Sequence, residues 1–256
     1  MDVGVIVENL PYMLSGLQWT VILASISMVG SFAAGTAFAI LRLSPYRWLR
    51  WPAILYVDVM RTIPLIMVIF WVFFLLPVLT GQPTTPLKAA LLALIAFNTS
   101  YMAEVIRAGI QSVPRGQMEA ARACGLTYLR AMRFVILPQA IKNMVPALVN
   151  RFVALFMGTS LAYIIGVTEF FRAANNVNNR VYRSYEIYTF VAIVYFVCCY
   201  SLSLLSRILE RRLARAERFT AGPASVMVEG EPVALGALRA GQAPCALPGA
   251  GSRRPE

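Results

Sequence analysis

The sequence predicts an all-α membrane protein with five transmembrane helices. Hydrophobic residues make up 59% of the chain and charged residues only 14%, whereas soluble domains carry about 25% charged residues. The mean hydropathy is +0.66. A hydrocarbon core about 30 Å thick requires roughly 20 apolar residues in a helix, and the chain contains several nearly uncharged stretches of this length.

These stretches follow one another along the chain, with charged residues mostly near their ends. The first has no charge from Asn9 to Leu41, and the fourth is interrupted by Arg151. No basic segment precedes the first stretch and no small-residue cleavage site follows it, so we expect no cleaved signal peptide. The predicted spans cover about residues 18–41, 54–79, 87–110, 144–167 and 187–209.

Lysine and arginine in the connecting loops predict the orientation, because cytoplasmic loops carry an excess of both. The segment before the first span has neither, and the loop after the second has at most Lys88. We therefore place the N-terminus outside and the C-terminus in the cytoplasm. The same rule accounts for the net charge of +11 without a nucleic-acid partner. One loop breaks the alternation, with arginines on the expected outer side: Arg172, Arg180 and Arg183.

Several kinds of site are excluded by residues that the sequence lacks. It has no histidine, which is the commonest metal ligand and general base. The motifs GxSxG, HExxH and GxxxxGK[ST] are absent, so we expect neither a hydrolase site nor a nucleotide site. The four cysteines lack metal-site spacing. We expect no catalytic residue, metal or cofactor on this chain, and any energised process requires another subunit.

The last part of the chain differs in composition from the rest. From about Thr220 to Glu256 it is rich in Ala, Gly and Pro and has no apolar period, which predicts disorder. We therefore expect a transmembrane domain over residues 1–218 and a disordered cytoplasmic tail over residues 219–256. The sequence indicates no function for this tail.

A polar loop of about residues 111–143 separates the third and fourth spans. Its middle reads EAARACGLTYLRAMRFVILP, and Gly125 divides it into two helix-favouring parts, since glycine suits a helix C-cap or sharp turn. An apolar stripe at helical spacing predicts either a docking surface or an amphipathic helix on lipid headgroups. The stripe consists of Ala121, Cys124, Tyr128, Met132 and Val135.

This stretch resembles the EAA motif of permease subunits of ATP-binding-cassette (ABC) importers, EAA-x3-G-x9-I-x-LP. The match begins at Glu119 and departs from the pattern only at Val135, where isoleucine is usual. Three further segments are similar to elements of polar amino-acid permeases: RTIPL from Arg61, YMAEVIRAG from Tyr101 and GTSL from Gly158. The resemblance covers about residues 11–212. It assigns structural motif positions to Arg61, Pro64, Glu104 and Arg107.

The resemblance implies a type I ABC importer permease fold in the bacterial inner membrane, with a coupling helix in the polar loop. The expected partners are a cytoplasmic ATPase dimer holding ATP-Mg, an extracytoplasmic amino-acid-binding protein, and a sister permease or second copy of this chain. An alternative is that the alanines only pack the loop against its own helices. The residues expected at the ATPase contact are Glu119, Ala120, Ala121, Gly125, Leu137 and Pro138.

Polar residues within the third and fourth spans are candidates for a substrate pathway, because such groups face the interior of a helix bundle. They are Asn98, Thr99, Ser100, Gly158, Thr159 and Ser160. Helix contacts in lipid offer an alternative role for the small ones. Arg151 either extends toward the membrane surface or offers positive charge to an anionic substrate. Near the cytoplasmic ends, the spacing allows Asp58 to pair with Arg61 and Glu104 with Arg107.

Two segments are most similar to the glutamate/aspartate permease branch: SLAYIIGVTEFFRAA from Ser160 and RTIPLIMVIFW from Arg61. An acidic substrate also suits the outward-facing arginines. Another polar or basic amino acid remains an alternative. In a different class, a secondary transporter or channel would need no ATPase, and internal repeats or broken helices would favour it. A membrane enzyme is disfavoured, since the spans carry no paired carboxylates.

Overall fold

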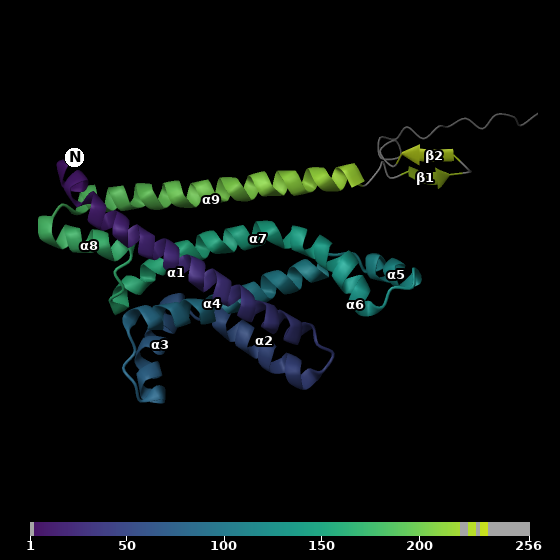
Figure 1. Ribbon diagram of the computed structural model, residues 1–256, viewed down its shortest axis with the longest axis horizontal. Helices are drawn as coiled ribbons and strands as arrows, with labels where there is room; N and C mark the ends of the chain where they lie inside the picture. The colour runs from purple at the N-terminus through teal and green to yellow at the C-terminus, as the bar shows by residue number, and fades with distance from the viewer. Residues whose placement is uncertain (1–2, 221–224, 229–230, 235–256) are drawn as a thin grey trace, which may run out of the picture. The chain divides into compact units, whose positions relative to one another are not determined.

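The computed structural model in Figure 1 describes residues 3–220, 225–228 and 231–234. The chain divides into two compact units, Met1–Glu210 and Arg211–Glu256. The first unit contains the long helices α1 (Val3–Leu43), α4 (Pro86–Gln111), α7 (Leu137–Gly158) and most of α9 (Ser184–Thr220). Its shorter elements are α2 (Arg47–Thr62), α3 (Leu65–Thr80), α5 (Arg115–Ala123), α6 (Tyr128–Ala131), the π-helix η1 (Met132–Ile136), the 3₁₀-helix η2 (Thr159–Ile165) and α8 (Phe170–Val181).

Four helical segments within the described residues are long and apolar enough to cross a membrane. They are Gly4–Leu43, Pro86–Gln111, Tyr128–Ile165 and Ser184–Leu209. Each contains most or all of one predicted span, namely the first, third, fourth and fifth. The all-α membrane architecture predicted from the sequence is thereby confirmed for the first unit.

The second span is not the single helix that the sequence predicted over residues 54–79. It consists of α2 and α3, whose axes differ by 110°. The break lies at Ile63 and Pro64, where both residues have extended backbone angles. Proline has no N–H to donate within a helix and disfavours helical angles at the residue before it. Asp58 and Arg61 are the only charged residues between 54 and 79, so hydropathy predicted one continuous span, and Pro64 was the available signal for the break.

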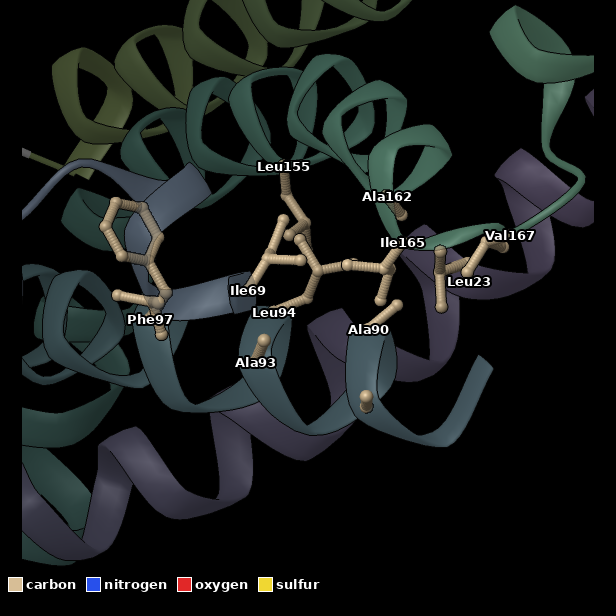
Figure 2. Close-up of a cluster of buried hydrophobic side chains, with 12 residues drawn as sticks. Leu23, Ile69, Ala90, Ala93, Leu94, Phe97, Leu155, Ala162, Ile165 and Val167 are labelled. Atoms are coloured by element: carbon tan, nitrogen blue, oxygen red, sulfur yellow. The ribbon is translucent and has the colours of Figure 1, made fainter. Parts of the chain in front are cut away.

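The core of the first unit forms where α1 and α3 pack on α4. Small residues of α4, including Ala90 and Ala93, are fully buried and face larger side chains such as Leu23 of α1 and Ile69 of α3. Figure 2 shows this cluster, with Leu155 of α7 completing it. In lipid, such close contacts stabilise helix association through van der Waals packing, because apolar burial against lipid supplies no hydrophobic driving force.

Helix α8 lies outside the predicted spans, whereas the 3₁₀-helix η2 lies within the predicted fourth span. Helix α8 packs on the first turns of α1, which begin well before predicted residue 18, through a cluster that includes Met13, Phe170 and Val177. The 3₁₀-helix η2 ends at Gly166, whose φ of 102° belongs to the left-handed region. The sequence predicts a loop between the fourth and fifth spans, and the structure contains helix α8 there.

Part of the predicted disordered tail has regular structure in the second unit. Helix α9 continues to Thr220, and two strands, β1 (Ser225–Val228) and β2 (Glu231–Ala234), pair antiparallel. Neither the strands nor this extension is predicted from the sequence. Residues 221–224, 229–230 and 235–256 lie outside the described part of the chain, so their predicted disorder stays a prediction.

Candidate functional site: the coupling segment and a polar cluster in the membrane

The polar loop contains a short helix before Gly125, as the sequence predicted. Helix α5 begins after Pro114, which has an extended backbone, and ends at Ala123. The loop is attached to the core at its start, where Val113 is buried among α1, α4 and α7 residues. Nearby, the Asn143 amide donates to the hydroxyl of Ser112 at 2.8 Å. In Figure 1, α5 and α6 lie together beyond the adjacent ends of α4 and α7.

Gly125 terminates α5 with a positive φ of 82°. The N–H of Leu126 donates to the carbonyl of Ala121 at 3.2 Å, and the N–H of Gly125 donates to Arg122 at 3.0 Å. This pair of bonds is the Schellman arrangement, which satisfies the last carbonyls of a helix and requires a left-handed residue. Nothing lies within 4 Å of a Cβ placed on Gly125, so the motif glycine is needed for its backbone angles.

The motif alanines divide between two roles. Ala120 and Glu119 are exposed, whereas Ala121 is only 7% exposed. Ala121 therefore packs α5 against the rest of the protein, which is the role that the alternative interpretation gave to the alanines. Ala120 and Glu119 are accessible to another protein. The predicted apolar stripe does not share one helix face, because the helix ends between Ala121 and Tyr128. The large apolar side chains exposed beyond α5 are Tyr128, Leu129 and Phe134.

The motif ends in an irregular helix. Residues 132–136 form the π-helix η1, and α7 begins at Leu137 with Pro138 in its first turn. The helix is continuous from α6 through η1 into α7, and the N–H of Leu137 donates to the carbonyl of Met132. Pro138 has no N–H to donate, so it interrupts the hydrogen-bond series directly after the π-helical turn. Leu137 is half-buried and Pro138 exposed. Single π-helical turns occur frequently at functional sites, and this one sets how α6 leads into the fourth span.

A network of charges joins α1, α2 and α4 near the start of the polar loop. The carboxylate of Glu104 accepts a hydrogen bond from Arg42 at 2.8 Å. It also forms the predicted ion pair with Arg107, at 2.5 Å. Asp58 lies 3.8 Å from Arg42, so it does not pair with Arg61 as predicted. The reason is tertiary: α1 brings Arg42 between the two carboxylates. The motif carboxylate Glu104 therefore has a structural partner on a different helix.

A second polar cluster lies in the middle of α4. Asn98 is fully buried, and its side-chain amide donates to the hydroxyl of Ser31 on α1 at 2.7 Å. Its carbonyl oxygen accepts from Nε of Arg151 on α7. The guanidinium carbon of Arg151 lies 3.6 Å from the ring centroid of Tyr101, and that of Arg61 lies 5.4 Å from the same centroid. Two predicted site residues, Arg61 and Arg151, thus lie against one aromatic ring, and a third, Asn98, is hydrogen-bonded to Arg151.

The other predicted pathway residues do not join this cluster. The hydroxyls of Ser100 and Thr159 donate to carbonyls of their own helices, at 2.7 and 2.8 Å, and both residues are fully buried. Thr99 is 2% exposed, and its hydroxyl has no partner among the described residues. A Cβ on Gly158 would lie 3.0 Å from Leu65. These contacts are the kind expected for the alternative role, helix packing, and a role in the substrate pathway stays a prediction for these positions.

Ser160 lies elsewhere, beside a pocket of about 590 Å³. Its walls are mainly apolar and aromatic, as is usual for small-molecule sites. The pocket lies between the end of α7 and helices α8 and α9, and its walls include Met157, Phe171, Tyr188 and Tyr195. Among the predicted pathway residues, Ser160 lines this pocket and Arg151 does not.

Glu169 was not singled out from the sequence. It is fully buried at the start of α8, where its carboxylate accepts from the N–H groups of Phe171 and Arg172, both at 2.8 Å. Burial raises the pKa of this carboxyl from 4.5 to about 7, against the lowering effect of both hydrogen bonds. Its place before the helical sequence FFRAANNV was the available signal, because acidic residues favour helix N-caps.

Metal binding finds no support in the described residues, which contain no group of three potential His, Cys, Asp or Glu ligands. The chain matches, over residues 12–215, the family model described as "Binding-protein-dependent transport system inner membrane component". The chain belongs to this family. It thus has the type I permease fold with a coupling helix between the third and fourth spans.

Named relatives and a solved structure agree with this assignment. Glutamate/aspartate import permease protein GltK of Escherichia coli O6:H1 (strain CFT073) is 40% identical over 83% of the chain and 98% of its own length. Probable glutamine ABC transporter permease protein GlnM of Bacillus subtilis (strain 168) is 36% identical over 84% of the chain and 100% of its own length. A crystal structure titled as an amino acid ABC transporter with histidines has a TM-score of 0.78 and 34% identity, covering 83% of the chain and 99% of its own.

Proposed function

We propose that the chain is the membrane-spanning permease subunit of an ATP-driven importer, and that it translocates glutamate and aspartate. The observation that carries the first part is α5, a rigid short helix with a defined end at Gly125 and an exposed Glu119 and Ala120. Such a helix suits insertion into a cleft of a partner protein. The acidic substrate is supported by the 40% identity to a glutamate/aspartate permease.

In this proposal ATP is hydrolysed by a separate ATPase dimer, which holds ATP-Mg and contacts Glu119, Ala120 and Gly125. The exposed apolar side chains Tyr128 and Leu129, at 58% and 77% exposure, extend the same surface. A second permease and an extracytoplasmic binding protein complete the importer. The polar loop and C-terminus face the cytoplasm, in accordance with the arginine distribution.

A second candidate substrate is glutamine, because a glutamine permease is 36% identical over nearly the same length. The broken span formed by α2 and α3 is a feature that would also suit a secondary transporter. The family membership favours the ATP-driven mechanism instead.

The experiment that tests this proposal places a bulky charge on the exposed face of α5. Ala120→Arg should leave the protein folded, because the side chain is exposed, but should reduce co-purification of an ATPase by at least about tenfold, as for a disrupted interface centre. Uptake of labelled glutamate should fall in parallel. Gln82→Arg, also exposed but in the loop between α3 and α4, is the control, and co-purification of the ATPase should be unchanged in it. ATP-dependent uptake that survives Ala120→Arg with no ATPase bound would contradict the proposal.

A further inference from the structure

The guanidinium of Arg151 lies deep in the membrane-spanning part of the first unit. Its Nε donates to Asn98, and Asn98 lies near the middle of α4, which runs from Pro86 to Gln111. At 1.5 Å per residue, Asn98 is roughly 18–20 Å from either helix end. The hydrogen bond therefore holds the guanidinium near mid-depth, and Arg151 does not extend to the membrane surface.

This cation has no carboxylate partner among the described residues. The ion pairs there connect Asp58 and Glu104 with Arg42 and Arg107, and none includes Arg151. A guanidinium carries five N–H donors, yet the described side-chain hydrogen bonds of Arg151 use only Nε. Neither terminal nitrogen of Arg151 is a buried atom without a hydrogen-bond partner. Because the described hydrogen bonds do not use these nitrogens, they reach an accessible surface.

A second cation is close by. The guanidinium carbons of Arg61 and Arg151 lie 5.4 and 3.6 Å from the centroid of the same Tyr101 ring. They can be no farther apart than the sum of these two distances. Arg61 is exposed and likewise has no ion pair among the described residues. Two positive charges at such a separation in a medium of low dielectric repel each other, and the aromatic ring only partly compensates.

The surrounding structure fixes this arrangement. Asn98 is fully buried and held by Ser31, so its carbonyl oxygen is directed to Arg151. Phe97 adds a second aromatic ring, 5.8 Å from the same guanidinium carbon. The break between α2 and α3 follows Arg61 by two residues, which places this side chain next to an interruption of the second span. A charge held so firmly without an acidic partner indicates a site for an anion.

We propose that Arg151, with Arg61 on the other side of the cluster, binds the carboxylate of an acidic amino acid during its passage. This inference rests on the proposed function and specifies the substrate class that the membrane site accepts. A zwitterionic amino acid such as glutamine carries its own ammonium and leaves the cluster positively charged. Glutamate or aspartate carries one further negative charge and offsets one of the two positive charges, which matters most where charges are poorly solvated.

Selection in this site is by net charge. A charge-assisted hydrogen bond made to only one of the two substrates corresponds to at least about tenfold in preference. Arg151→Gln should therefore lower the ratio of glutamate to glutamine uptake by at least about tenfold. Arg151→Lys keeps the charge but not the planar fork, and should restore part of the preference.

The test uses the complete importer reconstituted in phosphatidylcholine vesicles, with labelled glutamate and glutamine transported in parallel and ATP hydrolysis measured in the same vesicles. Arg207→Gln, an exposed arginine on α9, serves as the matched control and should behave as the wild type. In the Arg151→Gln importer, glutamate transported per ATP hydrolysed should fall at least about tenfold. This second measurement supports the inference even where glutamine is carried slowly.

Three results would overturn the inference while leaving the permease function intact. One is an unchanged glutamate preference in Arg151→Gln. Another is an equal loss of glutamate and glutamine uptake with a lower melting temperature, which assigns Arg151 a structural role. The third is a defect that appears only when anionic lipid is included, which assigns the cluster to lipid phosphate. A wild-type importer that carries no amino acid would instead refute the proposed function itself.

Discussion

The contact between α1 and α4 and the coupling segment around α5 use glycine for opposite reasons. A Cβ on Gly35 of α1 would lie 2.4 Å from the Cβ of Met102 on α4, so that position needs space. A Cβ on Gly125 would meet nothing within 4 Å, but its φ of 82° disfavours other residues. The first glycine lets two helices approach closely. The second gives the chain its direction after a helix.

The same two regions differ in how their side chains are paired. The α1 and α4 contact is buried and internally bonded, whereas the coupling segment exposes side chains that a partner protein would cover. At the α1 and α4 contact, the buried polar groups Ser31 and Asn98 bond each other. In the coupling segment, Glu119 and Ala120 are exposed, and large apolar side chains beyond them are exposed as well. A mutation in the first region should therefore affect folding, and one in the second should affect assembly and transport.

The largest effect is expected for Gly35→Leu. The leucine side chain would meet Met102 and the backbone of Ala103, and overpacking of rigid neighbours costs about 1–3 kcal/mol or more. We expect little folded protein in a size-exclusion profile of the solubilised chain. Gly116→Leu is the matched control, because nothing lies within 4 Å of a Cβ there. Equal yields for the two variants would contradict the role of Gly35 in helix contact.

A smaller effect on stability, with a larger one on transport, is expected for Gly125→Ala. A left-handed residue other than glycine costs roughly 1–2 kcal/mol, which should alter the exit from α5 while the membrane helices stay folded. Gly125→Asn should be tolerated better, since asparagine adopts this conformation more readily. Gly116→Ala, a helical position without contacts, should be neutral. Glutamate uptake and ATPase co-purification measure the effect, and an identical loss in all three variants would argue against a conformational cause.

The smallest effect concerns pH and compares a buried with an exposed carboxyl. Folding raises the pKa of Glu169 from 4.5 to about 7. The folded protein therefore holds a proton between these values that the unfolded chain has lost, so stability falls as pH rises through this window. The melting temperature of the purified protein should decrease from pH 5 to pH 7.5, and Glu169→Gln should flatten the decrease. Glu119→Gln, at an exposed position, should leave it unchanged.

Much of the coupling segment could be predicted from sequence. Gly125 marked the end of a helix because only a few residues tolerate its conformation, and the structure has that helix and that end. The apolar stripe from Ala121 to Val135 was predicted less well, since its spacing assumed one continuous helix. The turn that Gly125 makes places Ala121 and Tyr128 on separate helices.

The polar residues within the membrane were all predicted as candidates for a substrate pathway, but the structure gives them different contacts. Asn98 and Arg151 are 53 residues apart in sequence and are hydrogen-bonded, whereas the hydroxyls of Ser100 and Thr159 bond their own helices. Side-chain chemistry alone does not distinguish these outcomes, because a hydroxyl within a helix is able to bond a carbonyl one turn away. A guanidinium cannot be satisfied in that way and requires groups from other helices.

The sequence by itself determined that this chain lies in a membrane, where its apolar stretches fall and which loop contains a short helix that ends at Gly125. These follow from local composition, helix length and the backbone preference of single residues. The tertiary structure decided which charges meet, that the second span breaks at Pro64, and that Arg61 and Arg151 share one aromatic ring. Such pairings depend on how helices approach one another, and no local pattern specifies that approach.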